Sequence, residues 1–431
     1  MQKTNNRPPD IAVLEAAARQ ALQNGNEQEA IRAWGQILDQ DPNHVRTLSA
    51  LGHHSFRKGN MQSARVAFQR VVDVSGNDSQ QWVNLALACQ GLKDEQGEEA
   101  AIKGALTVDP SDLLGLILRG NLLERQGKSH LAAAAYGAAA TVSPPLDQLN
   151  PELRPSVLHA MSFQEKYNKQ CAAFIDGYLE PHYKEFAGER LARFRQSIDI
   201  MVGRKVRYDA QPLLHYYPGL PAIEFFERDE FPWLDDFEAA TDGIRDEFLN
   251  VLKTEQGFTP YITYPDDVPL NQWAELNNSP QWSAFHLIKS GKRVADNAAK
   301  CPLTMRLLGT APQPVQTGRT PAAMFSLLKP KTRIPPHTGS SNVRLVTHLP
   351  LIIPERCGFR VGNETREWLP GKAWVFDDTI QHEAWNDSDK LRVVLIFDIW
   401  HPHLTPPERA LISAMTAGME KFAGSAAGFD L

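Results

Sequence analysis

The chain has 431 residues, which is long for one domain, and its 42% hydrophobic content supplies material for two or three cores. Its net charge of −6 argues against a nucleic-acid-binding face. The first stretch, MQKTNNRPPDIA, lacks the apolar centre of a signal peptide, and no apolar run reaches the length of a membrane span. The four cysteines show no CxxC spacing, which favours reduced thiols and predicts a cytoplasmic protein.

The first third of the chain repeats with a period of 34 residues. Gly25, Gly59 and Gly127 keep this period, and Lys93 occupies the missing place. Three further classes of residue follow the same register: the small residues Ala18, Gly52, Ala86 and Gly120, the large residues Trp34, Phe68, Ile102 and Tyr136, and the prolines Pro42, Pro110 and Pro144.

This pattern resembles the tetratricopeptide repeat, in which a pair of helices recurs along the chain. Small residues let paired helices approach, a large side chain fills the space between them, and proline ends the second helix. The resemblance predicts an α-helical solenoid of about four repeats over residues 10–145. Such a solenoid usually offers a concave groove for a peptide or another protein. The alternative is an appendage that only stabilises or dimerises the chain.

After the repeats, the sequence pattern changes twice along the chain. Residues 146–202 keep helical spacing but lose the period, so we interpret them as a helical connector. Beyond residue 320, short β-rich runs follow one another: MFSLL, VRLVTHLPLII, GFRVG, REWL, KAWVFDD and LRVVLIFDIW. Strands at this spacing predict a sandwich or barrel within a domain over residues 203–425, and GNETREWLPG is typical of a hairpin.

Two of the thirteen histidines stand out by their context. His337 follows Pro335 and Pro336 and is predicted to begin a strand, while His382 is predicted to lie in a turn between two strands. A small barrel can bring two such positions together at its mouth, and neutral imidazole suits iron, zinc or copper. At this point a metal site and a structural role both stay open for the pair.

Ferrous oxygenases commonly add a carboxylate to two histidines, often two residues after the first. That place is taken by Gly339, which cannot bind a metal. Asp377, Asp378 and Glu383 lie near His382 in the sequence, but acids at a strand end more often hydrogen-bond a turn. We interpret these three acids as structural.

Three stretches of the sequence are specific enough to indicate a protein family: PHTGSSNVRLVTHLPLIIP, GNETREWLPGKAWVFDDTIQHEAWN and LRVVLIFDIWHPHLTP. They resemble the catalytic domain of the aspartyl/asparaginyl β-hydroxylase family, and the likeness runs in pieces from residue 218 to residue 409. The resemblance implies a double-stranded β-helix, a jelly-roll or cupin-like fold. It also implies iron(II), held by two histidines without a carboxylate, with 2-oxoglutarate and O2 as cosubstrates. Animal members carry tetratricopeptide repeats before the oxygenase, as this chain does.

The roles of the family's residues carry over where the positions match. His337 and His382 match the two iron ligands. Arg392 matches the arginine that pairs with the distal carboxylate of 2-oxoglutarate, and Ser326 and His348 match further contacts to that carboxylate.

The residues around Arg392 agree with this role. The arginine lies in the apolar strand LRVVLIF, where a charge without a partner is costly. An anionic cosubstrate is a sensible partner, because a guanidinium offers a planar two-donor fork that lysine does not reproduce. The alternative is a salt bridge between Arg392 and Asp398.

The match weakens at the substrate. Arg344, Val346 and His348 share one strand face, because side chains alternate along a strand. Members that hydroxylate aspartyl residues have a second arginine where this chain has Val346. Arg344 and Trp282 are candidate substrate contacts, although Arg344 can equally be an internal strand charge. We expect hydroxylation of an unactivated C–H bond on an aspartyl/asparaginyl-type or other peptidyl side chain.

The predicted fold class is therefore multidomain α + β, with a helical solenoid before a double-stranded β-helix. Two alternatives to an oxygenase stay open. One is a repeat scaffold with an inactive oxygenase domain, against which the histidine pair and the arginine speak. The other is a cupin-like metalloenzyme that does not use 2-oxoglutarate, against which Ser326 and Arg392 speak.

Overall fold

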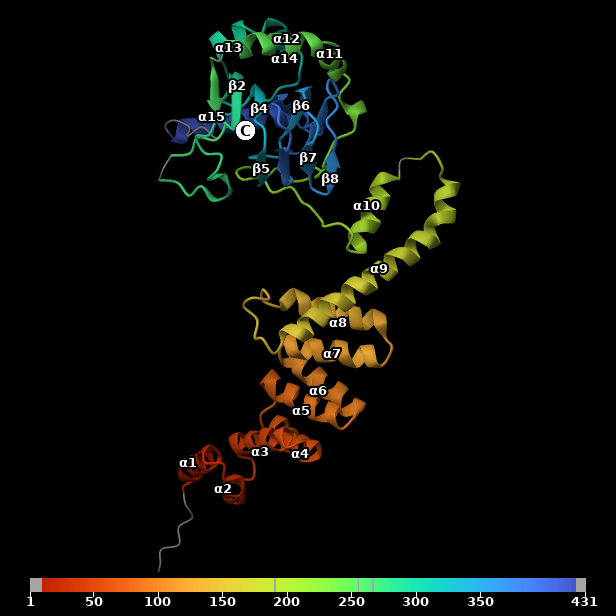
Figure 1. Ribbon diagram of the computed structural model, residues 1–431, viewed down its shortest axis with the longest axis vertical. Helices are drawn as coiled ribbons and strands as arrows, with labels where there is room; N and C mark the ends of the chain where they lie inside the picture. The colour runs from red at the N-terminus through yellow and green to blue at the C-terminus, as the bar shows by residue number, and fades with distance from the viewer. Residues whose placement is uncertain (1–9, 190, 255, 266, 424–431) are drawn as a thin grey trace, which may run out of the picture. The chain divides into compact units, whose positions relative to one another are not determined.

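The computed structural model describes residues 10–189, 191–254, 256–265 and 267–423 (Figure 1). The chain divides into two compact units between Gly203 and Arg204. Residue 425, the expected end of the second domain, and residues 1–9, which the signal-peptide argument used, lie outside the described residues. Among the helices of the described ranges, none is long and apolar enough to cross a membrane.

The first unit opens with helices that pack in consecutive pairs, which confirms the predicted repeats. Within a pair, the first helix has 13 residues and the second has 14. The helices are α1 (Ile11–Gln23), α2 (Glu27–Gln40), α3 (Val45–Arg57), α4 (Met61–Val74), α5 (Ser79–Gly91), α6 (Glu95–Val108), α7 (Leu113–Arg125) and α8 (Ser129–Val142).

The repeated residues explain how each pair packs. The ring of Phe68 lies against Gly52 and leaves no room for a side chain there, and Tyr136 meets Gly120 in the same way. The turn inside each pair requires a residue with a left-handed backbone. The third pair uses Lys93, at φ 58°, where the other pairs have glycine at φ of 69° to 75°.

The connector is helical, as its spacing predicts, and comprises α9 (Arg154–Glu185) and α10 (Ala192–Met201). The first turns of α9 pack on α8, where the rings of Phe163 and Tyr136 lie 5.1 Å apart. Farther along, α9 exposes Phe174 and Tyr178 to solvent. The beginning of α9 therefore extends the packing of the repeats.

The second unit contains two antiparallel sheets that share a core between them, as in a double-stranded β-helix. The larger sheet has the order β1-β2-β4-β11-β6-β9 with β3 beside β2, and the smaller has the order β5-β10-β7-β8. β7 and β8 form a hairpin that begins earlier than predicted, because the stretch GNETREWLPG supplies its turn and second strand while its first strand is Cys357–Val361. The strands are β1 (Phe258–Pro260), β2 (Trp282–Lys289), β3 (Lys292–Arg293), β4 (Ala323–Leu328), β5 (Thr332–His337), β6 (Arg344–Ile352), β7 (Cys357–Val361), β8 (Glu364–Arg366), β9 (Trp374–Phe376), β10 (His382–Asn386) and β11 (Arg392–Trp400).

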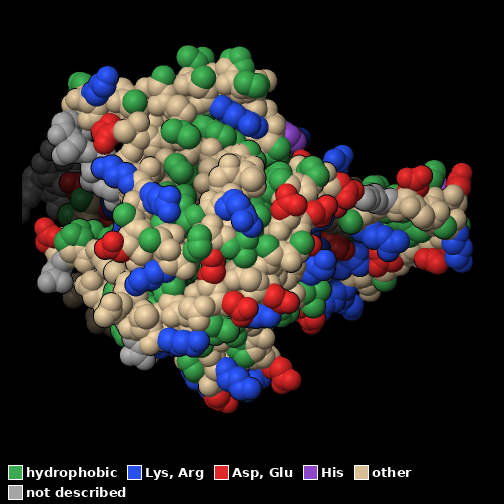
Figure 2. Space-filling view, turned by 90° about the horizontal axis from the view of Figure 1, so that it is seen from above, with side chains coloured by type: hydrophobic (Ala, Val, Ile, Leu, Met, Phe, Trp, Pro, Cys, Tyr) green, Lys and Arg blue, Asp and Glu red, His purple; other side chains and the backbone are tan. Residues whose placement is uncertain are grey.

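Helices cover the outer face of the larger sheet (Figure 1). Alternate residues of β11 point to this side, and the ring of Phe397 stacks on that of Phe237 at 4.9 Å. Val394 and Ile396 point the other way, toward the smaller sheet. The helical elements are η1 (Arg228–Glu230), α11 (Leu234–Ala239), α12 (Thr241–Leu252), η2 (Asn271–Trp273), α13 (Ala295–Ala299), α14 (Pro302–Leu308) and α15 (Pro406–Ala423). On the face drawn in Figure 2, basic and acidic side chains are interspersed.

Two local predictions were wrong. His337 ends β5 instead of beginning a strand, and His382 begins β10 instead of lying in a turn. The reason is that Pro335 and Pro336 belong to the strand, which starts at Thr332. β5 is the edge strand of its sheet, where proline is tolerated because no neighbour needs its N–H. Antiparallel pairing of β5 with β10 sets His337 opposite His382.

Candidate functional site

A cavity of about 400 Å³ lies between the two sheets. Six of the seven predicted site residues line it, and they come from β2, β4, β5, β6, β10 and β11. These residues are Trp282, Ser326, His337, His348, His382 and Arg392.

The two histidines face each other at this cavity, with ring centroids 4.0 Å apart. The Nδ1 atom of His337 lies 2.8 Å from the carbonyl oxygen of Pro335, and that of His382 lies 3.1 Å from the carbonyl oxygen of Ile380. Because a carbonyl only accepts, each Nδ1 carries the proton and each Nε2 keeps a free lone pair. This is the arrangement that orients metal-binding histidines.

Burial keeps both imidazoles neutral. It lowers the pKa of His337 to about 3, and the neighbouring His382 contributes to that shift. Burial likewise lowers the pKa of His382 to about 4. At neutral pH the pair can therefore bind a cation without first releasing protons.

The seventh predicted residue, Arg344, does not line the cavity. It is buried, and its Nη2 lies 3.0 Å from Oδ2 of Asp378, which does line the cavity. Burial raises the pKa of Asp378, and Arg344 opposes that shift. The Asp378 carboxylate also fills the space beside Gly339, where an added Cβ would overlap it. Arg344 is thus an internal strand charge with an acidic partner.

The other acids near His382 stabilise local structure, as the sequence indicates. Oδ1 of Asp377 accepts hydrogen bonds from the backbone N–H and the hydroxyl of Thr379, at 2.9 and 2.6 Å. Glu383 pairs with Arg360 at 2.5 Å. Each of these two acids therefore makes a local contact that holds its segment in place.

Arg392 is a buried cation without a protein anion. The residue is 1% exposed, and its Nε and Nη1 atoms have no hydrogen-bond partner in the described part of the chain. Burial lowers its pKa to about 10, so it stays charged at neutral pH. Its guanidinium carbon lies 4.7 Å from the ring centroid of Trp368. The alternative salt bridge is not formed: Arg392 and Asp398 lie six residues apart on β11, and Oδ1 of Asp398 accepts from the backbone N–H of Ala322.

Two further donors lie on the strands on either side of Arg392. Trp282 donates its Nε1–H to the Ser326 oxygen at 3.2 Å, which leaves the Ser326 hydroxyl hydrogen free to donate. Nδ1 of His348 is buried without a partner, and the His348 ring stacks on Trp368 at 5.5 Å. The strand order β4-β11-β6 brings these donors to one sheet face, and a carboxylate is the chemical group that such a cluster fits.

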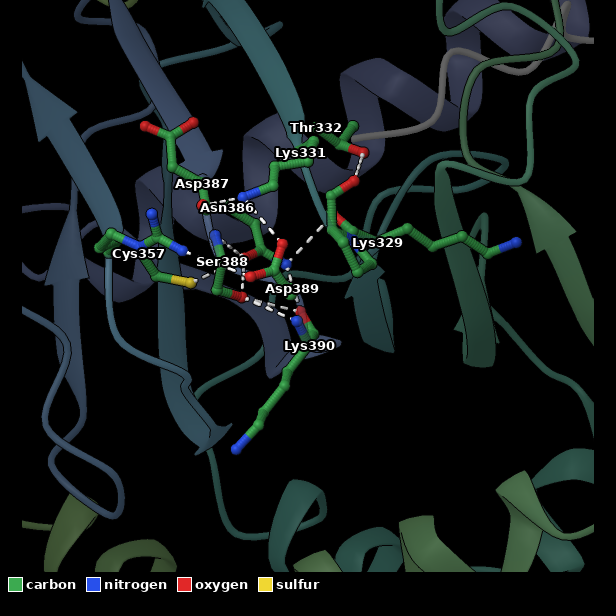
Figure 3. Close-up of polar contacts among 11 residues, drawn as sticks. Lys329, Lys331, Thr332, Cys357, Asn386, Asp387, Ser388, Asp389 and Lys390 are labelled. Carbon is green, nitrogen blue, oxygen red and sulfur yellow. Dashed lines mark hydrogen bonds and ion pairs between the residues drawn. The ribbon is translucent and has the colours of Figure 1, made fainter.

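A polar network fixes the start of the strand that carries Arg392 (Figure 3). The buried Asn386 amide donates to the carbonyl oxygens of Leu328, Lys329 and Lys390, at 2.8 to 3.1 Å. Its oxygen accepts from the hydroxyl of Ser388 at 2.6 Å. The end of β10, the end of β4 and the turn before β11 are thereby held together, which relates the histidine strand to the arginine strand.

Several lining or supporting residues were missed by the sequence analysis. Tyr261 stacks on Trp282 at 4.0 Å, and Trp273 meets the edge of His337 at 5.0 Å. The aromatic content of residues 258–282 is a signal that could have indicated this wall. Nothing local marks Trp368, which approaches Arg392 only through the fold.

The donor set fits the groups that the resemblance implies. Among the described residues, no cluster of three or more His, Cys, Asp or Glu could hold a metal ion. A metal at the histidine pair would therefore have two imidazole ligands, which suit a transition metal such as iron. The orphaned donors of Arg392 and His348 fit an anion such as a 2-oxo dicarboxylate.

Comparisons with known proteins find matches within each of the two units. A family model described as aspartyl/asparaginyl beta-hydroxylase matches residues 238–402, and one described as tetratricopeptide repeat matches residues 15–81. Human aspartyl/asparaginyl beta-hydroxylase is 38% identical over 174 residues, which is 40% of this chain and 21% of that protein. The ornithine lipid ester-linked acyl 2-hydroxylase of Rhizobium tropici is 34% identical over 200 residues, 46% of this chain and 67% of that protein.

The matches cover different shares of the compared proteins. The chain spans only about a fifth of the length of the human relative. Among solved structures, a crystal structure of the MamA protein matches 42% of this chain and 97% of its own, with a TM-score of 0.33 and 18% identity.

Proposed function

We propose that this chain hydroxylates an unactivated C–H bond with iron(II), 2-oxoglutarate and O2. The reason is that the chain belongs to the aspartyl/asparaginyl β-hydroxylase family. The observation that carries the proposal is a buried guanidinium without an anion, in the same cavity as two neutral imidazoles. When bound, the metal and its cosubstrate activate O2: one oxygen atom enters the C–H bond as a hydroxyl, the other enters succinate, and CO2 leaves.

The chain's own residues bind and orient in this scheme. His337 and His382 hold the metal through Nε2, and their Nδ1 hydrogen bonds fix the ring orientations. Arg392 binds the distal carboxylate of 2-oxoglutarate with its two-donor fork, and Ser326 and His348 donate to the same carboxylate. Arg392 and the histidine pair line one cavity, so a single cosubstrate could be held by the guanidinium and reach a metal at the histidines.

Aromatic rings strengthen this binding by excluding water. Trp368 lies against Arg392 and also stacks on His348, while Tyr261 covers Trp282. An ion pair shielded in this way is stronger than one in water, because the local dielectric is low. Shielding also limits access of water to the reacting atoms.

We further propose that the helical repeats bind a peptide or protein and deliver it to the oxygenase. The support is the match of residues 15–81 to the tetratricopeptide repeat and the helix pairs over residues 11–142. The cytoplasm stays the predicted location, and fractionation of cells that express the tagged chain would test it.

Turnover of 2-oxoglutarate with substrate withheld tests the proposed chemistry. The full-length protein with iron(II) and O2 should form succinate slowly, and His337→Ala should form none. An inactive oxygenase domain would bind neither iron nor 2-oxoglutarate. A cupin-like enzyme of another kind would bind iron but leave 2-oxoglutarate intact.

A further inference from the structure

Exposed apolar side chains form part of the outer wall of the cavity. Leu213 and Leu214 line it and are 73% and 44% exposed, and Tyr264 lines it with 39% exposed. The backbone N–H of Leu213 donates to the carbonyl oxygen of Gly339 at 3.0 Å, so this leucine rim lies directly beside the end of the histidine strand. Farther in, Val346 continues the apolar lining. A group that enters from the rim passes uncharged side chains.

The charges of the cavity leave no place for a second carboxylate. Among the described lining residues, Arg392 is the one lysine or arginine, and the proposed function assigns it to the cosubstrate. Asp378 is the one acid, and it faces the same space. Arg344 lies outside the lining and is buried; its Nη2 pairs with Asp378, while its Nη1 has no hydrogen-bond partner among the described residues. An entering carboxylate would therefore lose its hydration beside an acid and meet no cationic side chain of the lining other than Arg392, which is costly.

Aromatic rings and neutral polar groups complete the wall near the histidines. Trp273 and Tyr261 line the cavity beside His337 and Trp282 and offer ring faces and edges to an apolar group. Side chains of Gln272, Thr338, Ser340 and Gln381 also line it. Neutral donors and acceptors of this kind can hydrogen-bond a peptide backbone, and Ser340 and Gln381 also accept from Arg344 and Arg360.

We infer that the group hydroxylated is an uncharged aliphatic or aromatic side chain of a peptide, not a carboxylate-bearing one. The inference rests on the proposed function. In the reaction R–H + 2-oxoglutarate + O2 → R–OH + succinate + CO2, R is a carbon of this side chain. The leucine rim and the aromatic wall select the side chain, and the neutral polar groups hold the flanking backbone.

Peptide pools with one fixed central residue and random flanks provide the test. One set of pools fixes leucine, valine, methionine or phenylalanine, and the other fixes aspartate, asparagine or lysine. Saturation-transfer NMR with the metal-free full-length protein measures binding, and mass spectrometry of pools incubated with iron(II), 2-oxoglutarate and O2 measures +16 Da products. We expect the apolar pools to exceed the aspartate pool at least tenfold in both, which corresponds to about 1.4 kcal/mol.

A matched pair of variants tests the leucine rim. Leu213→Asp should lower binding and product of the leucine pool at least fivefold, because it places an acid at the entrance. Leu411→Asp is the control, since Leu411 is 70% exposed on α15 and does not line the cavity. Equal effects of the two variants would contradict the role of the rim.

Failure of the inferred substrate class and failure of the proposed function give different results. Binding and product that favour the aspartate or asparagine pool would overturn the inference. So would products confined to acyl chains of a lipid extract, or no binding and no product in any pool. In each of these cases, succinate formation without substrate would leave the proposed function intact. Absence of that succinate would instead refute the proposed function, while the binding data would still show which side chains the cavity accepts.

Discussion

Replacing Arg392 by lysine should weaken 2-oxoglutarate binding more than tenfold. The guanidinium is buried, charged and without a protein anion, so the cosubstrate carboxylate would be its partner. A lysine ammonium is a point charge and cannot reproduce the two-donor fork. It would also lose the stacking over Trp368, 4.7 Å from the guanidinium carbon.

The size of the effect follows from the contacts that are lost. One hydrogen bond to a charged group contributes about 1.5–3 kcal/mol. At about 1.4 kcal/mol for each factor of ten, the loss of one such bond weakens binding roughly 10- to 150-fold. Anaerobic calorimetric titration of the iron-loaded protein with 2-oxoglutarate would measure this change directly. An affinity within a factor of about two of the wild type would refute the assignment of Arg392.

Arg392→Met separates a binding role from a structural one. If the charge has no protein partner, its removal should not lower the Tm of the protein without cosubstrate, because no ion pair is broken. In the wild type, 2-oxoglutarate at about 100 times its Kd should stabilise by about 2.7 kcal/mol. That corresponds to a rise in Tm of roughly 5–11 °C for a unit of this size, and the variant should show none. A marked fall in the variant's Tm without ligand would mean that Arg392 stabilises the fold.

Four further predictions concern the histidine pair, Gly339, Asp398 and the repeats. His337→Ala and His382→Ala should each abolish stoichiometric iron(II) binding in an anaerobic titration while urea unfolding stays cooperative. Gly339→Ala should lower the Tm by several degrees, because its Cβ overlaps a buried carboxylate and such overpacking costs about 1–3 kcal/mol. Asp398→Asn should raise the free energy of unfolding more at pH 8 than at pH 4. Residues 204–431 alone should keep succinate formation without substrate but modify fewer proteins of a cell lysate than the full chain.

The sign of the pH effect follows from burial, which raises the pKa of Asp398 to about 7. Between about pH 4 and pH 7 the folded protein keeps a proton that the unfolded chain loses, so stability falls as the pH rises. Asparagine removes that dependence, and its oxygen can still accept from Ala322. A difference between variant and wild type that is equal at pH 4 and pH 8 would contradict the raised pKa.

The predictions for Gly339, for the histidine pair and for the repeats each have a control or a contradicting result. Gly309→Ala is a matched control for Gly339→Ala, because a Cβ added at Gly309 would lie 3.3 Å from its nearest atom and would not overlap it. Unchanged iron binding in either histidine variant would remove that residue from the site. Equal modification of lysate proteins by the full chain and by residues 204–431 would contradict delivery by the repeats.

The repeats could be predicted from the sequence because their packing is local. Gly52 and Phe68 stand 16 residues apart and meet within one helix pair, so a fixed period encodes the contact. Even the exception was visible, since Lys93 interrupts the glycines and adopts the left-handed backbone itself. The sandwich of short strands was predictable because several short β-rich runs follow one another beyond residue 320.

The details of the site depend on contacts between distant strands, which no local pattern encodes. The pairing of Arg344 with Asp378 joins residues 34 apart, so the sequence left Arg344 open as a substrate contact. Pro335 and Pro336 suggested an approach to a strand, but the edge position of β5 let them lie within it. The role of Trp368 beneath Arg392 had no sequence signal at all.

The central claim is that the histidine pair and Arg392 form one site for iron and 2-oxoglutarate. Release of CO2 from carboxyl-labelled 2-oxoglutarate by the full-length protein, with and without iron(II), tests it most directly. We predict iron-dependent release with one succinate per CO2 in the wild type, and none in His382→Ala or with iron chelated. Release that persists in His382→Ala, or its absence from the iron-loaded wild type, would contradict the claim.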